Sequence, residues 1–386
     1  MKFKINSEDF SNAISWVTQG AALKETHPVI LALDSEDSAH VYFFDGTQYA
    51  KDNLDISNFN GDFEETKILM DAKFVKNLAK VIKDFPGEMQ IEEQKSQLLV
   101  KTQGGNKFHI PLLDQVSPSE PEIITIGEVD EAEFFEIISR VSKISDPSST
   151  LTLVNSVGFV FDMEKTGSEQ VIAIATDKFA FSEVRVPFVP AKTAGGKKKQ
   201  QLTYALPASK ATIANSTKTV GSPVALITST NMGFGYSFGD GRIVLFSTNS
   251  DEVMMKPSEQ MKAAAEKTNQ SATFSKKDFE KALNAISNLS LDSNTKNLKV
   301  VIKNSKMSMS DIDDNNSINI DLIDSEIEED IEITVLRDAV RKAMLPVTTA
   351  NMKIKWVEQS KVMQVVCVDN DGNDIEEIFT VCIVAL

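Results

Sequence analysis

The sequence predicts an α+β protein built from three repeated domains, each with two helices packed on antiparallel sheets. The length, a helical pattern that returns along the chain and the strand-like runs after each helix lead to this prediction. With 386 residues the chain is too long for a single core and fits two or three domains. Its hydrophobic content of 41% and charged content of 25% are typical of a folded protein. Internal repetition is therefore the first feature to test.

One helical pattern occurs once in each third of the chain. Its segments are residues 7–14 (SEDFSNAI), 131–138 (EAEFFEII) and 276–283 (KKDFEKAL). Each has Phe at its fourth position and an aliphatic residue four positions later, so that Phe10 and Ile14, for example, share one face of a helix. The aromatic residue returns at Phe134 and Phe279. The repeat is therefore close to one third of the chain.

A second helix is predicted later in each third, at residues 71–84, 207–219 and 335–343. Strand-like runs follow at residues 98–100 and 108–110, 242–246, and 362–368, and Asp-Gly turn sequences near residues 45, 240 and 371 indicate hairpins. The predicted domains are residues 1–124, 125–256 and 271–386. Residues 257–270 are expected to link the last two, with a short helix possible at 261–267. The acidic stretch 311–330 is expected to be a solvated hairpin and loop.

Composition narrows the functional classes. The net charge of -16 argues against a general nucleic-acid coat, although local clusters of cations could still meet DNA. No stretch approaches the roughly 20 apolar residues of a membrane span, so no membrane partner is predicted. The only cysteines, Cys367 and Cys382, lie in apolar runs and are expected to be core residues of a cytoplasmic protein.

Motifs for catalysis or cofactor binding are not recognisable. His27, His40 and His109 lie in separate contexts without an acidic or Cys partner at ligand spacing, so structural roles are expected. Gly195-Gly196-Lys197 lacks the upstream glycine of a phosphate-binding loop, and residues 369–374 fit a hairpin turn better than a calcium loop. No catalytic residue, metal or cofactor is predicted. An enzyme with an unrecognised site remains an alternative.

With three such repeats in order, the chain resembles the bacterial DNA polymerase III beta sliding clamp family over essentially its full length. The resemblance implies a head-to-tail homodimer that closes into a ring, with helices lining a hole and sheets forming the outer wall. It implies a non-catalytic processivity factor that encircles duplex DNA and tethers the replicative polymerase. A similar ring that tethers a transcription or repair factor is the alternative. The matching segments are Met1-Lys2-Phe3, residues 10–17, Lys24 to Thr26, Pro28-Val29, Ala175-Thr176-Asp177 and residues 379–386.

Charge is placed as such a ring requires. The six predicted helices together carry +4, although the whole chain carries -16. In the 71–84 segment, the four lysines form one stripe, predicted to lie opposite Phe74, Leu78 and Val81; in the 275–287 helix, two lysines are predicted to oppose Phe279, Leu283 and Ile286. Cations near phosphates give affinity without sequence preference. The candidate DNA-binding residues are Lys24, Lys73, Lys76, Lys80, Lys83, Arg140, Lys143, Lys197, Lys198, Lys199, Lys210, Lys218, Lys277, Lys281, Arg337 and Arg341.

The resemblance also implies two protein-binding surfaces. The family's polymerase and clamp loader dock through short peptide motifs, and the matching pocket here would comprise Val154, Thr176, Lys178, Phe179, Phe181, Thr380, Cys382, Ile383, Val384 and Leu386. This chain departs from the family there: Lys178 to Phe181 stand where the family has Gly-His-Arg-Leu, and the tail reads CIVAL. The implied dimer interface comprises Phe108, Ile110, Ile286 and Leu289.

Overall fold

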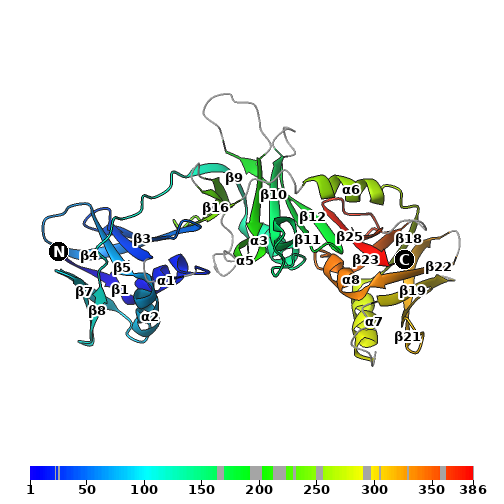
Figure 1. The fold of residues 1–386 in the computed structure, drawn as a ribbon, viewed down its shortest axis with the longest axis horizontal. Coiled ribbons are helices and arrows are strands. Elements are labelled where there is room, and N and C mark those ends of the chain that lie inside the picture. The colour runs from blue at the N-terminus through cyan, green and yellow to red at the C-terminus, as the bar shows by residue number, and fades with distance from the viewer. Residues whose placement is uncertain are drawn as a thin grey trace. The chain divides into compact units, whose positions relative to one another are not determined.

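The computed structural model describes residues 1–21, 23–24, 27–162, 169–191, 202–211, 223–228, 232–248, 255–289, 297–303, 306–327, 330–356 and 362–385. The chain forms two compact units (Figure 1). Unit 1 comprises Met1–Glu131, Val189–Ala194 and Ser216–Asn249, and unit 2 comprises Ala132–Phe188, Gly195–Asn215 and Ser250–Leu386. The second of the three predicted domains thus contributes to both units.

The order of secondary-structure elements repeats three times, as the sequence predicts. The first series is β1 (Lys2–Asn6), α1 (Ser7–Val17), β2 (Pro28–Leu33), β3 (Ser38–Phe44), β4 (Gln48–Asn60), β5 (Thr66–Asp71), α2 (Ala72–Ile82), β6 (Glu88–Gln94), β7 (Gln97–Thr102) and β8 (Lys107–Pro111). The second is β9 (Ile124–Asp130), α3 (Glu131–Val141), α4 (Thr152–Asn155), β10 (Ser156–Asp162), β11 (Gln170–Thr176), β12 (Ala180–Pro187), β13 (Val189–Pro190), β14 (Leu202–Pro207), α5 (Ala208–Ala211), β15 (Pro223–Thr228), β16 (Gly233–Ser237) and β17 (Ile243–Ser247).

After α6 (Met255–Ala265), the third series is β18 (Gln270–Ser275), α7 (Lys276–Leu289), β19 (Asn297–Lys303), β20 (Lys306–Asp311), β21 (Ser317–Glu326), β22 (Ile331–Leu336), α8 (Arg337–Met344), β23 (Asn351–Trp356), β24 (Val362–Val368) and β25 (Ile378–Ala385). We call the three series repeats 1, 2 and 3. One expectation needed correction, because the helix α6 in the link before repeat 3 begins earlier than expected. The acidic stretch 311–330 contains the turn of the β20–β21 hairpin and the mostly exposed strand β21.

Each unit has one continuous antiparallel sheet, and in each sheet two repeats are joined by strand pairing. In unit 1, β17 pairs with the beginning of β4, with Val244 opposite Ala50 and Leu245 opposite Tyr49. In unit 2, β25 pairs with the beginning of β12, with Val381 opposite Phe181. The last strand of one repeat therefore pairs with the fourth strand of the repeat before it. We call the β17–β4 pairing the first joint and the β25–β12 pairing the second joint.

An aspartate turn precedes the fourth strand of every repeat. Its Asp N–H donates to a carbonyl three to five residues later, at 3.2 Å in each of the pairs Asp45–Gln48, Asp177–Ala180 and Asp311–Asn316. The Asp Oδ1 accepts backbone N–H groups of the same turn, as in Asp45 with Thr47 and Gln48 at 2.8 Å. A short carboxylate that bonds its own backbone stabilises a tight turn, because it satisfies amides that the sheet leaves unpaired.

The helices α1 and α2 begin at side-chain caps and bury one apolar face. Asn6 accepts from Glu8 N–H at 2.8 Å at the start of α1, and Asp71 accepts from Phe74 N–H at 2.6 Å at the start of α2. The Ser11 hydroxyl donates to Ala79 O at 2.6 Å and thereby joins these two helices, which lie side by side (Figure 1). Both helices are therefore fixed at their starts and at their mutual contact.

The apolar face predicted for α2 was wrong for two of its three residues. The buried residues are Ala72, Val75, Leu78, Ala79 and Ile82, whereas Phe74 and Val81 are 40% and 45% exposed. The sequence supports two overlapping apolar stripes, and packing against α1 selects the stripe with small residues because Ala permits close helix approach. In α7 the prediction is confirmed, since Phe279, Leu283 and Ile286 are all buried.

Loss of the α2 cap should destabilise unit 1. Asp71→Ala leaves the Phe74 N–H without its acceptor and removes a negative charge from the helix N-terminus. We expect the free energy of unfolding to fall by about 1 kcal/mol, measured by urea denaturation. Asp71→Asn keeps an acceptor and should lose less, and Asp84→Ala, at an exposed position beyond the helix, should lose nothing. Equal midpoints for all three variants would contradict the cap.

Candidate functional site

Lysines lie along α2 in unit 1, and most of them are exposed. Lys73, Lys80 and Lys83 are exposed, as predicted. Lys76 is half-buried and donates to Thr18 O at 3.1 Å. Burial lowers the pKa of Lys76, and the neighbouring charge of Lys80 lowers it further. Lys76 therefore fixes the end of α1 and is less available to a ligand than the other three lysines.

In unit 2, two lysines of α7 project into solvent, whereas Arg341 of α8 connects the two helices. Lys277 and Lys281 are exposed, and Lys281 pairs with Asp278 at 3.2 Å. Arg341 donates to Asn284 Oδ1 at 3.0 Å and to the Ser287 hydroxyl at 3.2 Å, which joins α8 to α7. These arginine contacts order the scaffold and leave Lys277 as a readily accessible cation.

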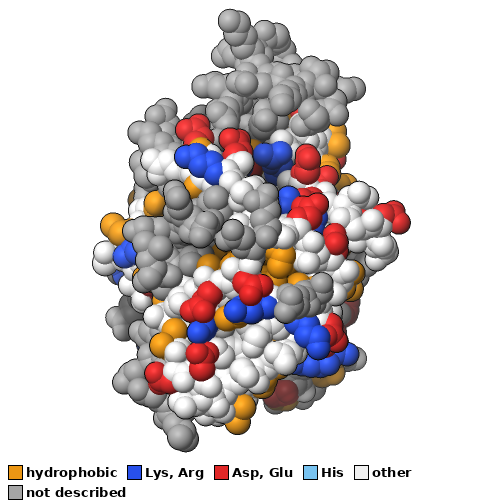
Figure 2. Space-filling model, turned by 90° about the vertical axis from the view of Figure 1, so that its right-hand side faces the viewer, with side chains coloured by type: hydrophobic (Ala, Val, Ile, Leu, Met, Phe, Trp, Pro, Cys, Tyr) orange, Lys and Arg blue, Asp and Glu red, His pale blue; other side chains and the backbone are white. Residues whose placement is uncertain are grey.

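The other candidate cations have mixed surroundings. Arg140 pairs with Glu136 and donates to Val347 O at 3.4 Å, and Arg337 donates to Asp338 at 3.1 Å. Lys24 and Lys143 are exposed, and Lys210 is half-buried. Lys197, Lys198, Lys199 and Lys218 lie outside the described residues. Across the part of the surface that Figure 2 shows, basic and acidic side chains are interspersed, so that face carries no field of a single sign.

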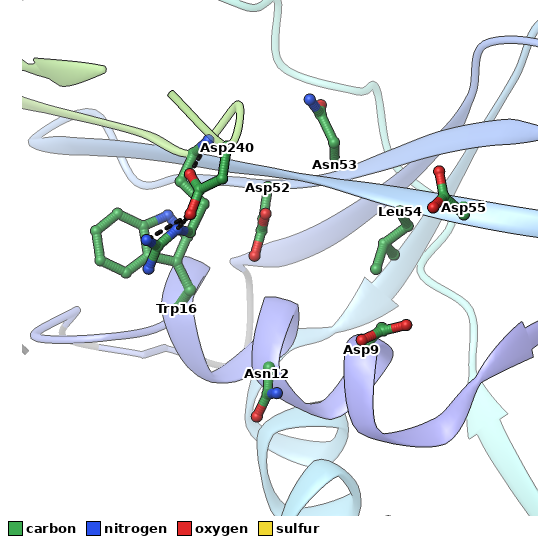
Figure 3. Close-up of a pocket in the computed structure, with 9 residues that line it drawn as sticks. Asp9, Asn12, Trp16, Asp52, Asn53, Leu54, Asp55 and Asp240 are labelled. Atoms are coloured by element: carbon green, nitrogen blue, oxygen red, sulfur yellow. Dashed lines mark hydrogen bonds and ion pairs between the residues drawn. The ribbon is translucent and has the colours of Figure 1, made fainter. Parts of the chain in front are cut away.

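Unit 1 also has an acidic cavity of about 470 Å³ between α1, β4 and the β16–β17 turn (Figure 3). Arg242 lies over the Trp16 ring, 5.0 Å from its centroid, and donates to Asp240 at 2.7 Å. Burial raises the pKa of Asp52 to about 6, although the Arg242 charge opposes this shift. The lining residues are Asp9, Asn12, Trp16, Asp52, Asn53, Leu54, Asp55, Asp240 and Arg242. A surface of this sign repels phosphate, which agrees with the acidic composition of the first helix.

The tail strand β25 lies inside the sheet of unit 2. It pairs with β12, β24 and β22, and the hydroxyls of Ser182 and Thr380 are 3.0 Å apart across the joint. Phe181 and Val381 share a core cluster, against which Met261 of α6 packs. The described tail residues therefore hold two repeats together.

Among the predicted pocket residues whose burial the structure describes, two are exposed. The buried ones, which are core residues and cannot line an open groove, are Val154, Thr176, Phe181, Thr380 and Cys382. Lys178 is exposed and Phe179 is 49% exposed. The backbones of Ile383 and Val384 continue β25, and Leu386 lies outside the described residues.

The turn that carries Lys178 and Phe179 is held tightly. Lys178 has a φ of 84°, a left-handed conformation that a residue with a Cβ rarely adopts; Gly46 has the same φ in the equivalent turn of repeat 1. Asp177 accepts from Phe179 N–H at 2.9 Å and pairs with Lys342 of α8 at 2.7 Å. The turn is therefore fixed to α8, and it presents one cation and one aromatic ring to solvent.

The predicted dimer-interface residues, like the predicted pocket residues, include both buried and solvent-accessible side chains. Ile110 and Ile286 are fully buried in the cores of their own units, which corrects their placement on a surface. Phe108 is half-buried on β8, and Leu289 is 53% exposed at the end of α7. Of the four predicted residues, Phe108 and Leu289 are therefore the two that solvent reaches.

Comparison with known proteins agrees with this geometry. The chain is similar to the DNA polymerase III subunit beta of Pseudomonas aeruginosa, with a TM-score of 0.81, 12% identity and 100% coverage of both chains. It is also similar to the Helicobacter pylori beta clamp bound to a DNA ligase peptide, with a TM-score of 0.76, 14% identity and 100% coverage of both chains. The chain has the fold of the bacterial beta sliding clamp.

At the level of sequence the similarity is distant. A curated relative, the beta sliding clamp homolog GriR of Streptomyces muensis, is 22% identical over 194 residues. The match covers 50% of this chain and spans only half the length of that relative. No family model matches the chain. The clamp fold has therefore been kept while most side chains differ.

Some features of this clamp fold escaped prediction from sequence. Of the three Asp turns, only the one at Asp45 was predicted as an Asp-Gly hairpin turn, although Asp45, Asp177 and Asp311 recur at nearly constant spacing. His40, expected to lack an acidic partner, lies between Asp34 and Glu120. In the described ranges, no cluster of His, Cys, Asp and Glu could hold a metal ion, and no helix is long and apolar enough to cross a membrane.

The two cysteines should report on the integrity of this tail. Burial raises the pKa of the Cys382 thiol to about 12 and also raises that of Cys367. Because the thiolate is the reactive form, alkylation of Cys382 at pH 8 should be at least about a hundredfold slower in the native chain than in urea, and alkylation of Cys367 should also be slower. Peptide mass spectrometry after iodoacetamide treatment measures both sites. Fast labelling of Cys382 alone would show that β25 detaches from β12.

Proposed function

We propose that this protein is a non-catalytic DNA sliding clamp, which encircles duplex DNA and tethers a DNA polymerase. The observation that carries the proposal is the clamp fold over the full length of the chain. Exposed lysines on α2 and α7 support it, because a ring needs cations that meet phosphates without reading bases. The cations assigned to DNA are Lys24, Lys73, Lys80, Lys83, Lys143, Lys277 and Lys281. In this proposal the clamp domains are residues 1–124, 125–256 and 271–386.

Ring closure can be argued from the two internal joints. Residues 317–321 of β21 follow the third Asp turn and, in the described chain, pair only with β20. They correspond to the stretches of β4 and β12 that pair with β17 and β25. The strand β8 ends the other sheet, and in the described chain its main-chain partner is β7. A second copy can join these two edges by repeating the internal joint.

The internal joint also gives the register. The hairpins before β8 and β17 close with the same bonds, Thr102 N–H to Asn106 O at 3.0 Å and Phe238 N–H to Arg242 O at 2.8 Å. Phe108 therefore corresponds to Val244, which pairs with Ala50 in the first joint. By the Asp turns, Ala50 corresponds to Ile318. We therefore place Phe108 of one copy opposite the partner's Ile318.

We place partner docking at the Lys178–Phe179 turn. A linear peptide binds through a few apolar anchors, and Phe179 is an exposed aromatic ring on a rigid turn. The H. pylori clamp named above was solved with a DNA ligase peptide, which supports short peptides as the partner class. A polymerase and a clamp loader are the partners proposed here. A transcription or repair factor is the alternative, because the pocket differs from that of the family.

Topological binding distinguishes a clamp from an ordinary DNA-binding protein. The loaded protein should stay on nicked circular DNA through gel filtration and leave within minutes after linearisation. The triple change of Lys73, Lys80 and Lys83 to Glu should reduce loading and its salt dependence, with stability almost unchanged because the sites are exposed. The matched control changes Lys95, Lys267 and Lys306, which are exposed and lie outside α2 and α7, to Glu. Equal retention on both DNA forms would refute the clamp.

Cysteine cross-linking tests the proposed joint. Opposite residues of paired strands have Cα atoms about 5 Å apart, within the range of a disulfide. The double variant Phe108→Cys and Ile318→Cys should therefore oxidise to a covalent dimer, seen on non-reducing gels. Phe108→Cys with Ile323→Cys is the control, since Ile323 is exposed on the same strand but out of register. A folded first variant that yields only monomer would rule out this register.

A further inference from the structure

The segment 112–123, which connects repeats 1 and 2, is bound to the sheet of repeat 1. Leu113 N–H donates to Leu69 O at 2.9 Å, and the side chains of Leu113 and Ile123 pack on the cluster that contains Tyr42 and Tyr49. The Tyr42 hydroxyl lies 3.0 Å from the Ser117 hydroxyl and donates to Pro118 O at 3.1 Å. The connection is therefore an ordered strap across the sheet.

Glu120 is the charged residue of this strap that reaches into the sheet. Its carboxylate accepts from the Tyr49 hydroxyl at 2.8 Å and lies 3.1 Å from His40 Nε2. The Nζ atoms of Lys51 and Lys67 are each 3.6 Å away. Strands β3, β4 and β5 thus all contribute a side chain to the Glu120 site.

His40 lies between two carboxylates. Its side chain is 6% exposed, and its Nδ1 is 2.8 Å from Asp34 Oδ2 while its Nε2 faces Glu120. An ionised carboxylate can only accept, and a neutral imidazole has one N–H to donate. Both contacts are hydrogen bonds only when the ring is protonated at both nitrogens. A neutral ring would turn a lone pair toward one carboxylate.

We propose that His40 is a protonation-dependent clasp, which holds the 112–123 strap through Glu120 when the ring is charged and loosens the strap when the ring is neutral. The same strands form the first joint, because Tyr49 pairs with Leu245 of β17. Loosening the strap therefore makes the connection between repeats 1 and 2 more flexible. The clasp depends on the fold alone and stands whether or not the protein encircles DNA.

The charges around His40 determine the sign of the effect. The His40 hydrogen bond, together with the one from Tyr49, lowers the pKa of Glu120 to about 2. The Glu120 carboxylate is therefore still ionised at pH values well below neutral. Burial and the Glu120 charge raise the pKa of Tyr49, which remains a donor. Asp34, Tyr42, Lys51 and Lys67 are the other groups that face the clasp. Histidine is the side-chain type that titrates between about pH 5 and 8, so the strap should be tighter at low pH.

Hydrogen exchange of the full chain, followed by mass spectrometry, tests the clasp. Protection factors, which correct for the intrinsic pH dependence of exchange, are compared at pH 5.5 and 8 for residues 112–123. The wild-type protection should fall about tenfold at the higher pH, the effect of one charged hydrogen bond. His40→Gln should remove this pH dependence, and Glu120→Gln should give low protection at both pH values. Residues 170–176 in β11 serve as the internal reference.

Two matched controls isolate the proposed contacts. Glu122→Gln makes the same chemical change at an exposed position of the same strap, and His27→Gln removes a histidine outside the clasp. Both should keep the wild-type pH dependence. Equal wild-type protection at the two pH values would overturn the proposal, as would a Glu122→Gln profile identical to that of Glu120→Gln. If His40→Gln does not fold, the protection of residues 112–123 in Glu120→Gln compared with Glu122→Gln still tests the proposal.

Discussion

Main-chain pairing between repeats is the constraint on which the rest of this structure depends. In each unit, the last strand of one repeat bonds to the strand that follows the Asp turn of the preceding repeat. The pairing has to be exact in register, because a slip by one residue would turn every side chain to the opposite face. The Asp turn fixes where the receiving strand begins. Burial of Phe181 and Val381 then stabilises one such register in unit 2.

Arg341 and Arg242 make fixed contacts whereas the exposed lysines of α2 project into solvent, and this difference follows from the chemistry of the two side chains. Arg341 uses the several donors of its guanidinium to join α7 and α8, and Arg242 stacks on Trp16 while pairing with Asp240. The exposed lysines of α2 instead end in compact, hydrated charges. Such groups attract phosphates loosely and without preference for orientation. Such contacts suit the sliding role proposed above, because rigid bidentate pairing would hold the protein in place.

The repeats could be predicted from the sequence, whereas most contacts in the candidate sites could not. Periodicity located the helices because each buries a face at regular spacing, and α7 buries the predicted residues. It failed for Phe74 and Val81, because two stripes fit the pattern and only the neighbouring helix decides between them. The Glu120 clasp and the Lys262–Glu183 pair join residues about 80 positions apart, at distances that only the folded sheet defines. The pocket residues were assigned from the resemblance, and the sequence does not reveal that β25 lies inside the sheet and that α6 packs against Phe181 and Val381.

The two joints within the chain and the one proposed between copies differ at one equivalent position. This difference bears on where the proposed ring would open. In the first joint this position is Lys51, beside Glu120 of the connecting strap. In the second it is Glu183, a buried carboxylate bonded to Lys262 of α6 at 2.6 Å. A buried charge needs such a partner, so each connection is held to its sheet. In the third repeat the equivalent residue is the exposed, neutral Asn319. The proposed joint between copies therefore has strand pairing but neither a covalent strap nor its ion pair, and it is the joint that should separate first.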